Sequence, residues 1–248
     1  MKEDKPSDLE RLAARTRPDG MPIMHQNWGK LLFMHWPIPA EALRPLIPEP
    51  LVVDKFKGSA WIAITPFTLW GVRPILIPPI PGLSDFHEIN VRTYVHLDGV
   101  PGVWFFSLDA SSSVAVLAAR TFFHLPYFSA DISLEQEERT IIYSSRRTDS
   151  EDRPADFDAT WTIGETLPYS HPGSLEFFLT ERYCLYTVNE ERLYRCRIFH
   201  QPWPLREAEL SSFSSSMIES HGLTTPQEEP LLHYAESLEV DIWPPEVL

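Results

Sequence analysis

Five polar residues are spaced so that strands and a helix rich in apolar residues would bring them together. Glu88, Asn90 and Arg92 alternate along one expected strand, so their side chains share one of its faces. Arg120 and Tyr127 flank the proline that stops an expected helix. Charged groups that turn toward an interior need partners, because an unpaired buried charge is very costly. We predict that the five converge on one enclosed pocket, with Arg120 as the preferred partner of Glu88.

These residue types suit chemistry on a keto or carboxylic acid. Glu88 is the candidate acid or base, and the guanidinium group of Arg120 or Arg92 is the candidate holder of a substrate carboxylate. Tyr127, with a reference pKa of about 10, starts as a neutral hydrogen-bond donor to a carbonyl or enolate oxygen. Two other interpretations stay open. The residues form a satisfied internal network, or the Glu88 face looks at solvent while the opposite face builds the core.

A second polar group lies near the end of the chain. Glu181, Arg182 and Tyr183 precede a strand whose neighbour carries Arg195, Arg197 and His200. Cross-strand Glu and Arg pairs on an exposed sheet are the favoured interpretation. An inward-pointing arginine such as Arg195 would instead bind a carboxylate in bidentate geometry. His200 is either an acid-base group or, more commonly, a hydrogen-bonded strand-end residue.

No cofactor or metal site is expected. The nine histidines form no HxH, HExxH or helical i, i+4 pair, and neighbouring His87 and Glu88 point to opposite faces of a strand. The chain lacks GxSxG, P-loop and GxGxxG motifs, and it has only ten glycines from which to build a phosphate-binding loop. Nucleotide-dependent chemistry is therefore disfavoured.

The elements that must position these residues are mostly short strands. The clearest is a hairpin over 88–96 and 103–109, with two glycines and a proline in its turn. Serines before 114–123 supply N-caps for a helix with apolar residues at helical spacing. Further strands are expected over the following ranges: 127–134, 139–146, 156–163, 182–188, 193–199 and 239–243. Brief helices are expected over 8–14, 37–47 and 173–180.

Many strands, few helices and no βαβ alternation predict a mainly β protein, a closed or nearly closed antiparallel barrel or sandwich with short helices. Residues 1–20 are polar and predict an N-terminal arm that lies outside the core, and residues 21–248 predict a single β domain. The proline-rich segment 73–82 cannot continue a central strand. We expect it to pack as a lid over the body of the domain.

The composition limits which molecules the protein is expected to bind and where in the cell it is expected to be found. The formal net charge of -14 argues against attraction to nucleic acid. The charge is uneven, since residues 207–248 hold nine acids and no Lys or Arg, which predicts a solvated acidic face. Cys184 and Cys196 lack zinc-ligand spacing and are expected to be reduced and buried. Without a signal sequence or an apolar run of about 18 residues, a cytoplasmic protein with no membrane contact is expected.

From about residue 25 to 243 the chain resembles the YqjF-like family of uncharacterised bacterial proteins, whose fold is similar to that of acetoacetate decarboxylase. The segments that carry the resemblance are 66–67 (PF), 73–74 (RP), 86–95 (FHEINVRTYV), 101–110 (PGVWFFSLDA), 119–120 (AR), 125–127 (LPY), 178–183 (FLTERY), 193–195 (LYR) and 200–203 (HQPW). The segment 118–128 resembles the catalytic segment of the decarboxylase itself, in which an arginine, a Gly-aromatic-Pro and two lysines follow one another. Tyr127 and Phe128 occupy the places of those lysines.

The resemblance implies an internal pocket but not Schiff-base decarboxylation, since a phenol cannot form an imine. Lys30, Lys55 and Lys57 lie far from the motif in sequence. The first hypothesis is a lyase-like pocket protein that acts on a small keto or carboxylic acid without a lysine. The alternatives are a non-catalytic small-ligand carrier and a self-assembling structural protein. Related folds make a homo-oligomer plausible.

Overall fold

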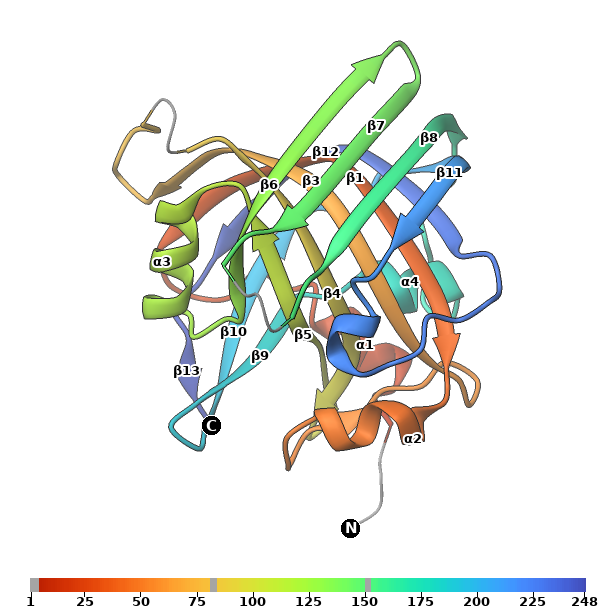
Figure 1. Ribbon diagram of the computed structural model, residues 1–248. Coiled ribbons are helices and arrows are strands. Elements are labelled where there is room, and N and C mark those ends of the chain that lie inside the picture. The colour runs from red at the N-terminus through yellow and green to blue at the C-terminus, as the bar shows by residue number, and fades with distance from the viewer. Residues whose placement is uncertain (1–4, 81–83, 150–152) are drawn as a thin grey trace.

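A sheet of thirteen strands that closes on itself dominates the computed structural model, which describes residues 5–80, 84–149 and 153–248 (Figure 1). The strands are β1 (Met24–Ile38), β2 (Val52–Val53), β3 (Ala60–Pro74), β4 (Phe86–Leu97), β5 (Val100–Ala110), β6 (Tyr127–Glu137), β7 (Thr140–Arg147), β8 (Asp156–Thr166), β9 (Cys184–Asn189), β10 (Arg192–His200), β11 (Leu205–Ser215), β12 (Leu231–Ile242) and β13 (Glu246–Val247). The helices are α1 (Asp8–Ala13), α2 (Ala40–Leu43), α3 (Ser113–Phe122) and α4 (Leu175–Thr180), with short 3-10 turns at Arg44–Leu46 and Glu219–His221. The predicted β class is confirmed.

Two extra pairings close the sheet. Strand β5 pairs with β4 along one edge, while its other edge meets β9 near Val103 and β6 near Leu108. Strand β12 pairs with β1 along one edge, and its other edge meets β10 near Ile242 and β11 near Ala235. The sheet thus branches at β5 and again at β12. One branch runs through β9 and β10, and the other runs through β6, β7, β8 and β11.

Strand β4 lies between two differently filled interiors. Its residues Ile89, Val91 and Val95 are fully buried in the main apolar core. The aromatic residues of β7 and β8 pack in the same core. Glu88 and Asn90, on the opposite face, are also buried, at 2% and 3% exposure. The predicted parity of this strand is correct, and both of its faces are covered.

Helix α3 follows β5 and is capped as the sequence predicts. The Ser112 hydroxyl accepts a hydrogen bond from the backbone N–H of Ala115. The helix ends at Phe122, and His124 takes a left-handed conformation with φ of +54°, a common way to end a helix. The chain then turns through Pro126 into β6, which pairs in parallel with the end of β5. The two short parallel contacts of β5, with β6 and β9, are departures from an all-antiparallel sheet.

The N-terminal arm is docked onto the barrel in its described part. Ser7 and Glu10 form a reciprocal capping box at the start of α1. Arg11, only 5% exposed, reaches inward and binds Asp54 through both terminal nitrogens at 2.7 Å. An arm of polar residues is therefore held by a buried ion pair that its composition did not indicate.

The proline-rich segment does not form the expected lid. Strand β3 continues through Pro74, and Leu76 is 88% exposed. Residues 81–83 lie outside the described residues. The predicted 37–47 helix is also shorter than expected, because β1 extends to Ile38 and only α2 and one 3-10 turn follow. No helix within the described ranges is both long and apolar enough to span a bilayer.

Candidate active site

A cavity of about 170 Å³ lies inside the barrel, on the Glu88 side of β4. Strands β1, β3, β4, β5 and β10 contribute to its wall, and α3 covers it with Ala115, Ala118 and Ala119. Small side chains on α3 leave room that larger ones would fill. One part of the lining is aromatic or aliphatic, and it includes Phe67 and Phe86. The other part is polar, so the cavity suits a small amphipathic molecule.

Glu88 is the central polar group of this cavity. The Tyr127 hydroxyl donates a hydrogen bond to Glu88 Oε2 at 2.6 Å. The Tyr143 hydroxyl donates to the Glu88 backbone carbonyl at 2.9 Å, from the main-core side of β4. Parity on β4 places the Glu88 side chain inward, and the Pro126 turn delivers Tyr127 opposite it. The structure therefore brings Glu88 and Tyr127 together, 39 residues apart in sequence.

The Glu88 carboxyl is poised to exchange a proton near neutral pH. Burial raises its pKa from 4.5 to about 7, against the lowering effect of hydrogen bonds from Tyr127 and Asn90. The buried Asp109 carboxylate adds a smaller upward contribution. Burial and the neighbouring Glu88 together raise the pKa of Tyr127 well above its usual 10. The phenol therefore stays protonated and acts as a donor.

Two arginines line the same cavity. Arg182 donates through Nε to the Phe178 carbonyl at 2.7 Å and through Nη1 to Asp54 at 2.8 Å, so the backbone and one carboxylate fix its orientation. Arg92 lies over the ring of Phe33, 5.2 Å from its centroid. Within the described ranges Arg92 makes no ion pair with any carboxylate. An anion in the cavity would supply the partner that Arg92 lacks.

The side chains around the cavity carry a net positive charge, which favours binding of an anion. Asp54 is shared between Arg11 and Arg182, so this buried cluster carries one more positive than negative charge. Arg92 adds another positive charge. Glu88 is the only carboxylate among the described residues of the lining, and its raised pKa of about 7 leaves it about half protonated at neutral pH.

Buried polar atoms without a partner gather at this cavity. Among the described residues that line it, five such atoms have no hydrogen-bond partner: Thr65 Oγ1, Asn90 Oδ1, Arg92 Nε, Arg182 Nη2 and Trp203 Nε1. Buried polar groups are nearly always satisfied in folded proteins, so a cluster of exceptions needs an explanation. Hydrogen-bonding groups of a bound molecule would satisfy them.

The predicted pair between Arg120 and Glu88 is wrong. Arg120 points away from the cavity, donating through Nε to the Tyr127 carbonyl and through Nη2 to Asp149, both at 2.7 Å. It lies on the outer side of α3 and fixes the start of β6 by its backbone. Arg120 thus holds Tyr127 in place but does not line the cavity.

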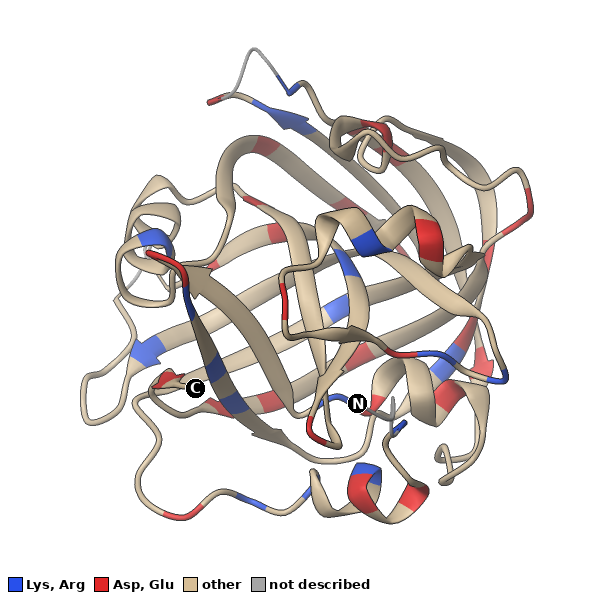
Figure 2. Ribbon diagram, turned by 90° about the horizontal axis from the view of Figure 1, so that it is seen from below, with Lys and Arg blue, Asp and Glu red and all other residues tan. Residues whose placement is uncertain are grey.

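Arg195 is also turned outward. Its Nε donates to Glu246 of β13 at 2.6 Å, and Figure 2 shows the basic residues of β10 beside the C-terminal end of the chain. His200 does line the cavity, together with Asn90 and Arg92. The His200 ring stacks on Tyr183 at 4.3 Å, and Nδ1 lies 2.7 Å from the Gln201 carbonyl. Burial lowers the pKa of His200, which keeps the ring neutral.

Sequence reasoning missed three of the five residues that present an unpartnered polar atom to the cavity. Thr65 and Trp203 were absent from the prediction, and Arg182 was assigned to an exposed cross-strand pair. Arg182 is paired instead with Asp54, 128 residues away. No local sequence pattern indicates this pairing, because the burial of Asp54 is visible only in the folded chain.

Schiff-base chemistry needs a lysine, and none lines the cavity in the described part of the chain. Lys30, Lys55 and Lys57 all lie outside the lining. Within the described residues no group of three metal-ligating side chains is present either. The titratable and charged groups that the described lining does hold are the Glu88 carboxyl, the Tyr127 phenol, the guanidinium groups of Arg92 and Arg182, the His200 imidazole and the thiols of Cys184 and Cys196.

The branched, closed sheet around a charged cavity defines a protein with the acetoacetate decarboxylase-like fold. The chain matches the enduracididine biosynthesis enzyme MppR, solved in complex with pyruvate, with a TM-score of 0.65 at 13% identity, covering 92% of this chain and 91% of that one. It matches acetoacetate decarboxylase from Legionella pneumophila subsp. pneumophila str. Philadelphia 1 with a TM-score of 0.61 at 12% identity, covering 100% and 98% of the two chains. At these identities the likeness shows the fold alone.

The chain belongs to the DUF2071 family, described as an uncharacterized conserved protein, whose model matches residues 25–239. It is 45% identical over 227 residues to the uncharacterized protein YqjF of Bacillus subtilis (strain 168), covering 92% of this chain and 93% of that protein. The predicted membership of the YqjF-like family is confirmed.

Proposed function

We propose that the chain binds a small keto acid in the barrel cavity and moves a proton to and from the carbon next to its carbonyl. The observation that carries this proposal is the set of five unpartnered polar atoms around a carboxyl whose pKa lies near 7. The MppR neighbour, which was solved with pyruvate, supports a keto acid as the ligand class.

The cavity offers a distinct partner for each part of such a ligand. The guanidinium group of Arg92 takes the carboxylate, with Nη2 of Arg182 as a second donor. The hydroxyl of Thr65 and the indole N–H of Trp203 are available to donate to the carbonyl oxygen. The apolar wall, which includes Phe67 and Phe86, receives the carbon chain.

Glu88 is the acid-base group in this proposal. Its ionised form accepts a proton from the carbon next to the ligand carbonyl, leaving an enolate, and the protonated form returns it. A pKa near 7 keeps both forms populated at neutral pH. Tyr127 holds the carboxyl in position and stabilises its ionised form by donating a hydrogen bond. Bonds and charges balance, because the proton that leaves carbon is the one that Glu88 carries.

Isothermal titration calorimetry and NMR exchange test the proposal in two stages. Calorimetry with pyruvate, 2-oxobutanoate and 4-methyl-2-oxopentanoate measures binding, and proton NMR in D₂O follows loss of the signal beside the carbonyl. We expect Arg92→Gln to weaken binding about ten-fold or more and Glu88→Gln to abolish exchange. Arg195→Gln is the matched control, because this arginine lies outside the cavity.

The two stages separate an enzyme from a carrier. Binding with exchange supports proton transfer, while binding that depends on Arg92 without exchange supports a non-catalytic carrier. If the acids do not bind, or if Arg195→Gln weakens binding as much as Arg92→Gln, the cavity is not a carboxylate site.

A further inference from the structure

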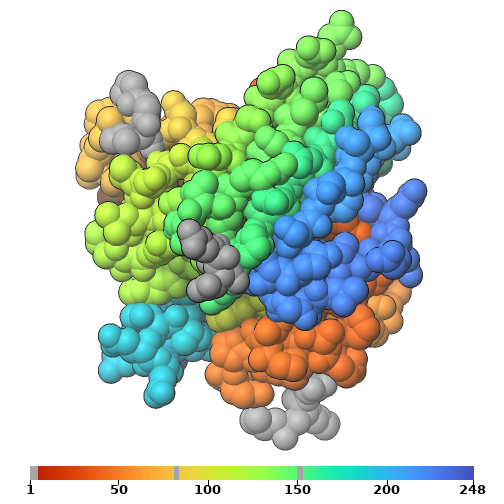
Figure 3. All heavy atoms as spheres, in the orientation of Figure 1, coloured from red at the N-terminus to blue at the C-terminus, as the bar shows by residue number. Residues whose placement is uncertain are grey.

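A second, wider hollow lies on the other branch of the sheet. It has a volume of about 1320 Å³ and runs between β11, the start of β12, α4 and the loop at 226–230. Figure 3 shows it as an opening between the blue atoms of β11 and the darker blue atoms that lead into β12, with orange atoms at its floor. We call this hollow the β11 groove. Strands β1 and β12 and helix α4 contribute to both hollows, but no residue that lines the β11 groove also lines the barrel cavity.

The groove exists because two strands separate. Strands β11 and β12 pair only at Leu205 with Ala235 and at Arg206 with Tyr234. Beyond Arg206, β11 is paired with β8 alone, and residues 231–233 of β12 are paired with β1 alone, as far as the described residues go. Each strand therefore presents a row of backbone N–H and C=O groups to the groove. Such an open edge is a template for an added strand.

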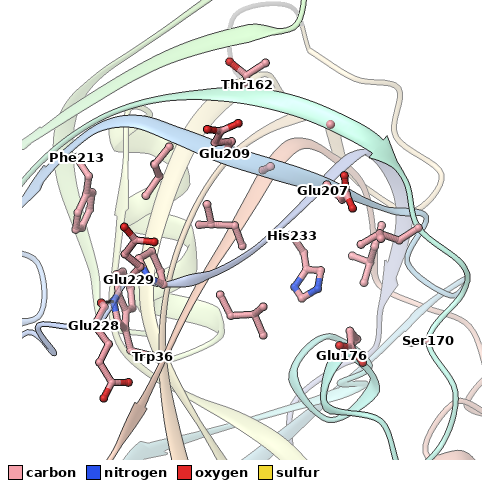
Figure 4. Close-up of a pocket in the computed structure, with 18 of the residues that line it drawn as sticks. Trp36, Thr162, Ser170, Glu176, Glu207, Glu209, Phe213, Glu228, Glu229 and His233 are labelled. Atoms are coloured by element: carbon pink, nitrogen blue, oxygen red, sulfur yellow. Dashed lines mark hydrogen bonds between the residues drawn. The ribbon is translucent and has the colours of Figure 1, made fainter.

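The charge of the groove is one-sided. Its lining contains five glutamates and, among the described residues, no Lys or Arg: Glu176, Glu207, Glu209, Glu228 and Glu229. None of the five makes an ion pair with a described basic side chain. Figure 4 shows them around the rim, with Glu207 and Glu209 on β11 and Glu228 and Glu229 at the opposite end. Four of the five belong to the acidic stretch of residues 207–248, and Glu176 of α4 is the fifth.

A buried histidine adds an independent sign of a ligand. His233, on β12, is only 4% exposed, and its Nδ1 atom has no hydrogen-bond partner among the described residues. Figure 4 shows its ring projecting into the space between Glu207 and Glu176. The aromatic rings of Trp36 and Phe213 lie at the same groove, so aliphatic side chains also find contacts there.

We propose that the β11 groove binds an extended, lysine- or arginine-bearing peptide segment of a partner protein, which adds a strand to the free edge of β11. The edge supplies backbone hydrogen bonds, and the glutamates select basic side chains. The volume exceeds the range of about 300–1000 Å³ that is typical of small-molecule sites. The same carboxylates repel other copies of this acidic chain, so the open edge does not pair with itself.

Fluorescence anisotropy with the whole chain tests the proposal. The probe is a fluorescein-labelled nine-residue peptide that alternates lysine with valine, and a glutamate-valine peptide of equal length is its opposite-charge control. We expect the lysine peptide to bind, to weaken as salt rises, and to weaken about three- to thirty-fold with the double variant Glu207→Gln, Glu209→Gln. The matched control is Glu135→Gln, Glu137→Gln, an equal charge change on exposed residues of β6. Circular dichroism checks that each variant folds.

A third peptide tests the added strand itself. Methylation of alternate backbone nitrogens keeps the lysine charges but removes the donors that pair with an edge, so this peptide should lose binding. Equal binding of the methylated peptide, an equal effect of the β6 control pair, or no binding at about 1 mM lysine peptide would overturn the proposal. If the methylated peptide still binds and spermine displaces the lysine peptide completely, the groove is a site for any polycation. That result would also overturn the proposal.

Discussion

Replacing Glu88 by glutamine should stabilise the protein, although it removes the proposed acid-base group. The Glu88 carboxyl is 2% exposed, and burial raises its pKa from 4.5 to about 7. Between those two pH values the unfolded chain loses the proton while the folded chain keeps it. Below about pH 4.5 Glu88 therefore does not change the free energy of unfolding. Between about pH 4.5 and pH 7 it lowers this free energy progressively, and above about pH 7 the loss stays constant.

The size of that cost follows from the shift. A change of 2.5 pKa units corresponds to about 3 kcal/mol. Glutamine has nearly the same shape, its amide oxygen accepts the Tyr127 hydroxyl, and its amide nitrogen has the unpartnered Asn90 oxygen within the same cavity. We expect Glu88→Gln to raise the free energy of unfolding at pH 8 by about 2–3 kcal/mol, or the midpoint temperature by about 5–10 °C.

Urea unfolding of both proteins at pH 4.5, 6, 7 and 8 measures this difference. The gain should be near zero at pH 4.5 and grow until about pH 7. Asp54→Asn is the control with the opposite sign. Burial pushes the pKa of Asp54 upward, but Arg182 and Arg11 outweigh it and the net shift is downward, so this variant should lose about 3 kcal/mol at pH 7. A Glu88→Gln protein that is less stable at pH 8, or whose gain does not change with pH, would falsify the reasoning.

Three further outcomes are expected. Tyr127→Phe removes a hydrogen bond that lowers the pKa of Glu88, so the pH midpoint of any Glu88-dependent exchange should move above 7; an unmoved midpoint would contradict the assigned contact. Ala118→Phe should fill the space under α3 and abolish keto-acid binding, measured by calorimetry, while circular dichroism stays unchanged; retained affinity would place the ligand elsewhere. Burial raises the pKa of the Cys184 thiol to about 12 and also raises the pKa of Cys196. Iodoacetamide at pH 8 should therefore alkylate the urea-unfolded chain but not the native protein. Rapid labelling of the native protein would mean that the cavity opens widely.

Alternation along strands was the most informative part of the sequence. It placed Glu88, Asn90 and Arg92 on one face of β4, and that face is the cavity wall. The same alternation on β10 separates Arg195 from His200, which the prediction had grouped together. Cys196 and His200 have one parity and line the cavity, whereas Arg195 has the other and pairs with Glu246 outside.

Other parts of the site depend on contacts that local patterns do not encode. The direction of Arg120 depends on which face of α3 packs on the sheet: this helix turns its alanines toward the cavity and Arg120 toward Asp149. The pairing of Arg182 with Asp54 and Arg11 joins three distant segments, one of them in the polar arm. Only the closed fold determines such long-range partners, because each residue taken alone fits an exposed surface equally well.

The distribution of partners argues against a purely structural network in the cavity. A network built for stability would pair Glu88 with an arginine, since both charges are then compensated. Instead Arg182 is tied to Asp54, Arg92 has no carboxylate partner in the described part of the chain, and Glu88 is held by a neutral phenol. This arrangement leaves a cation without a carboxylate partner beside a destabilised carboxyl in one cavity. A bound anion would compensate the charge of Arg92 and would favour the protonated form of Glu88, which is the acid that the proposed proton transfer needs.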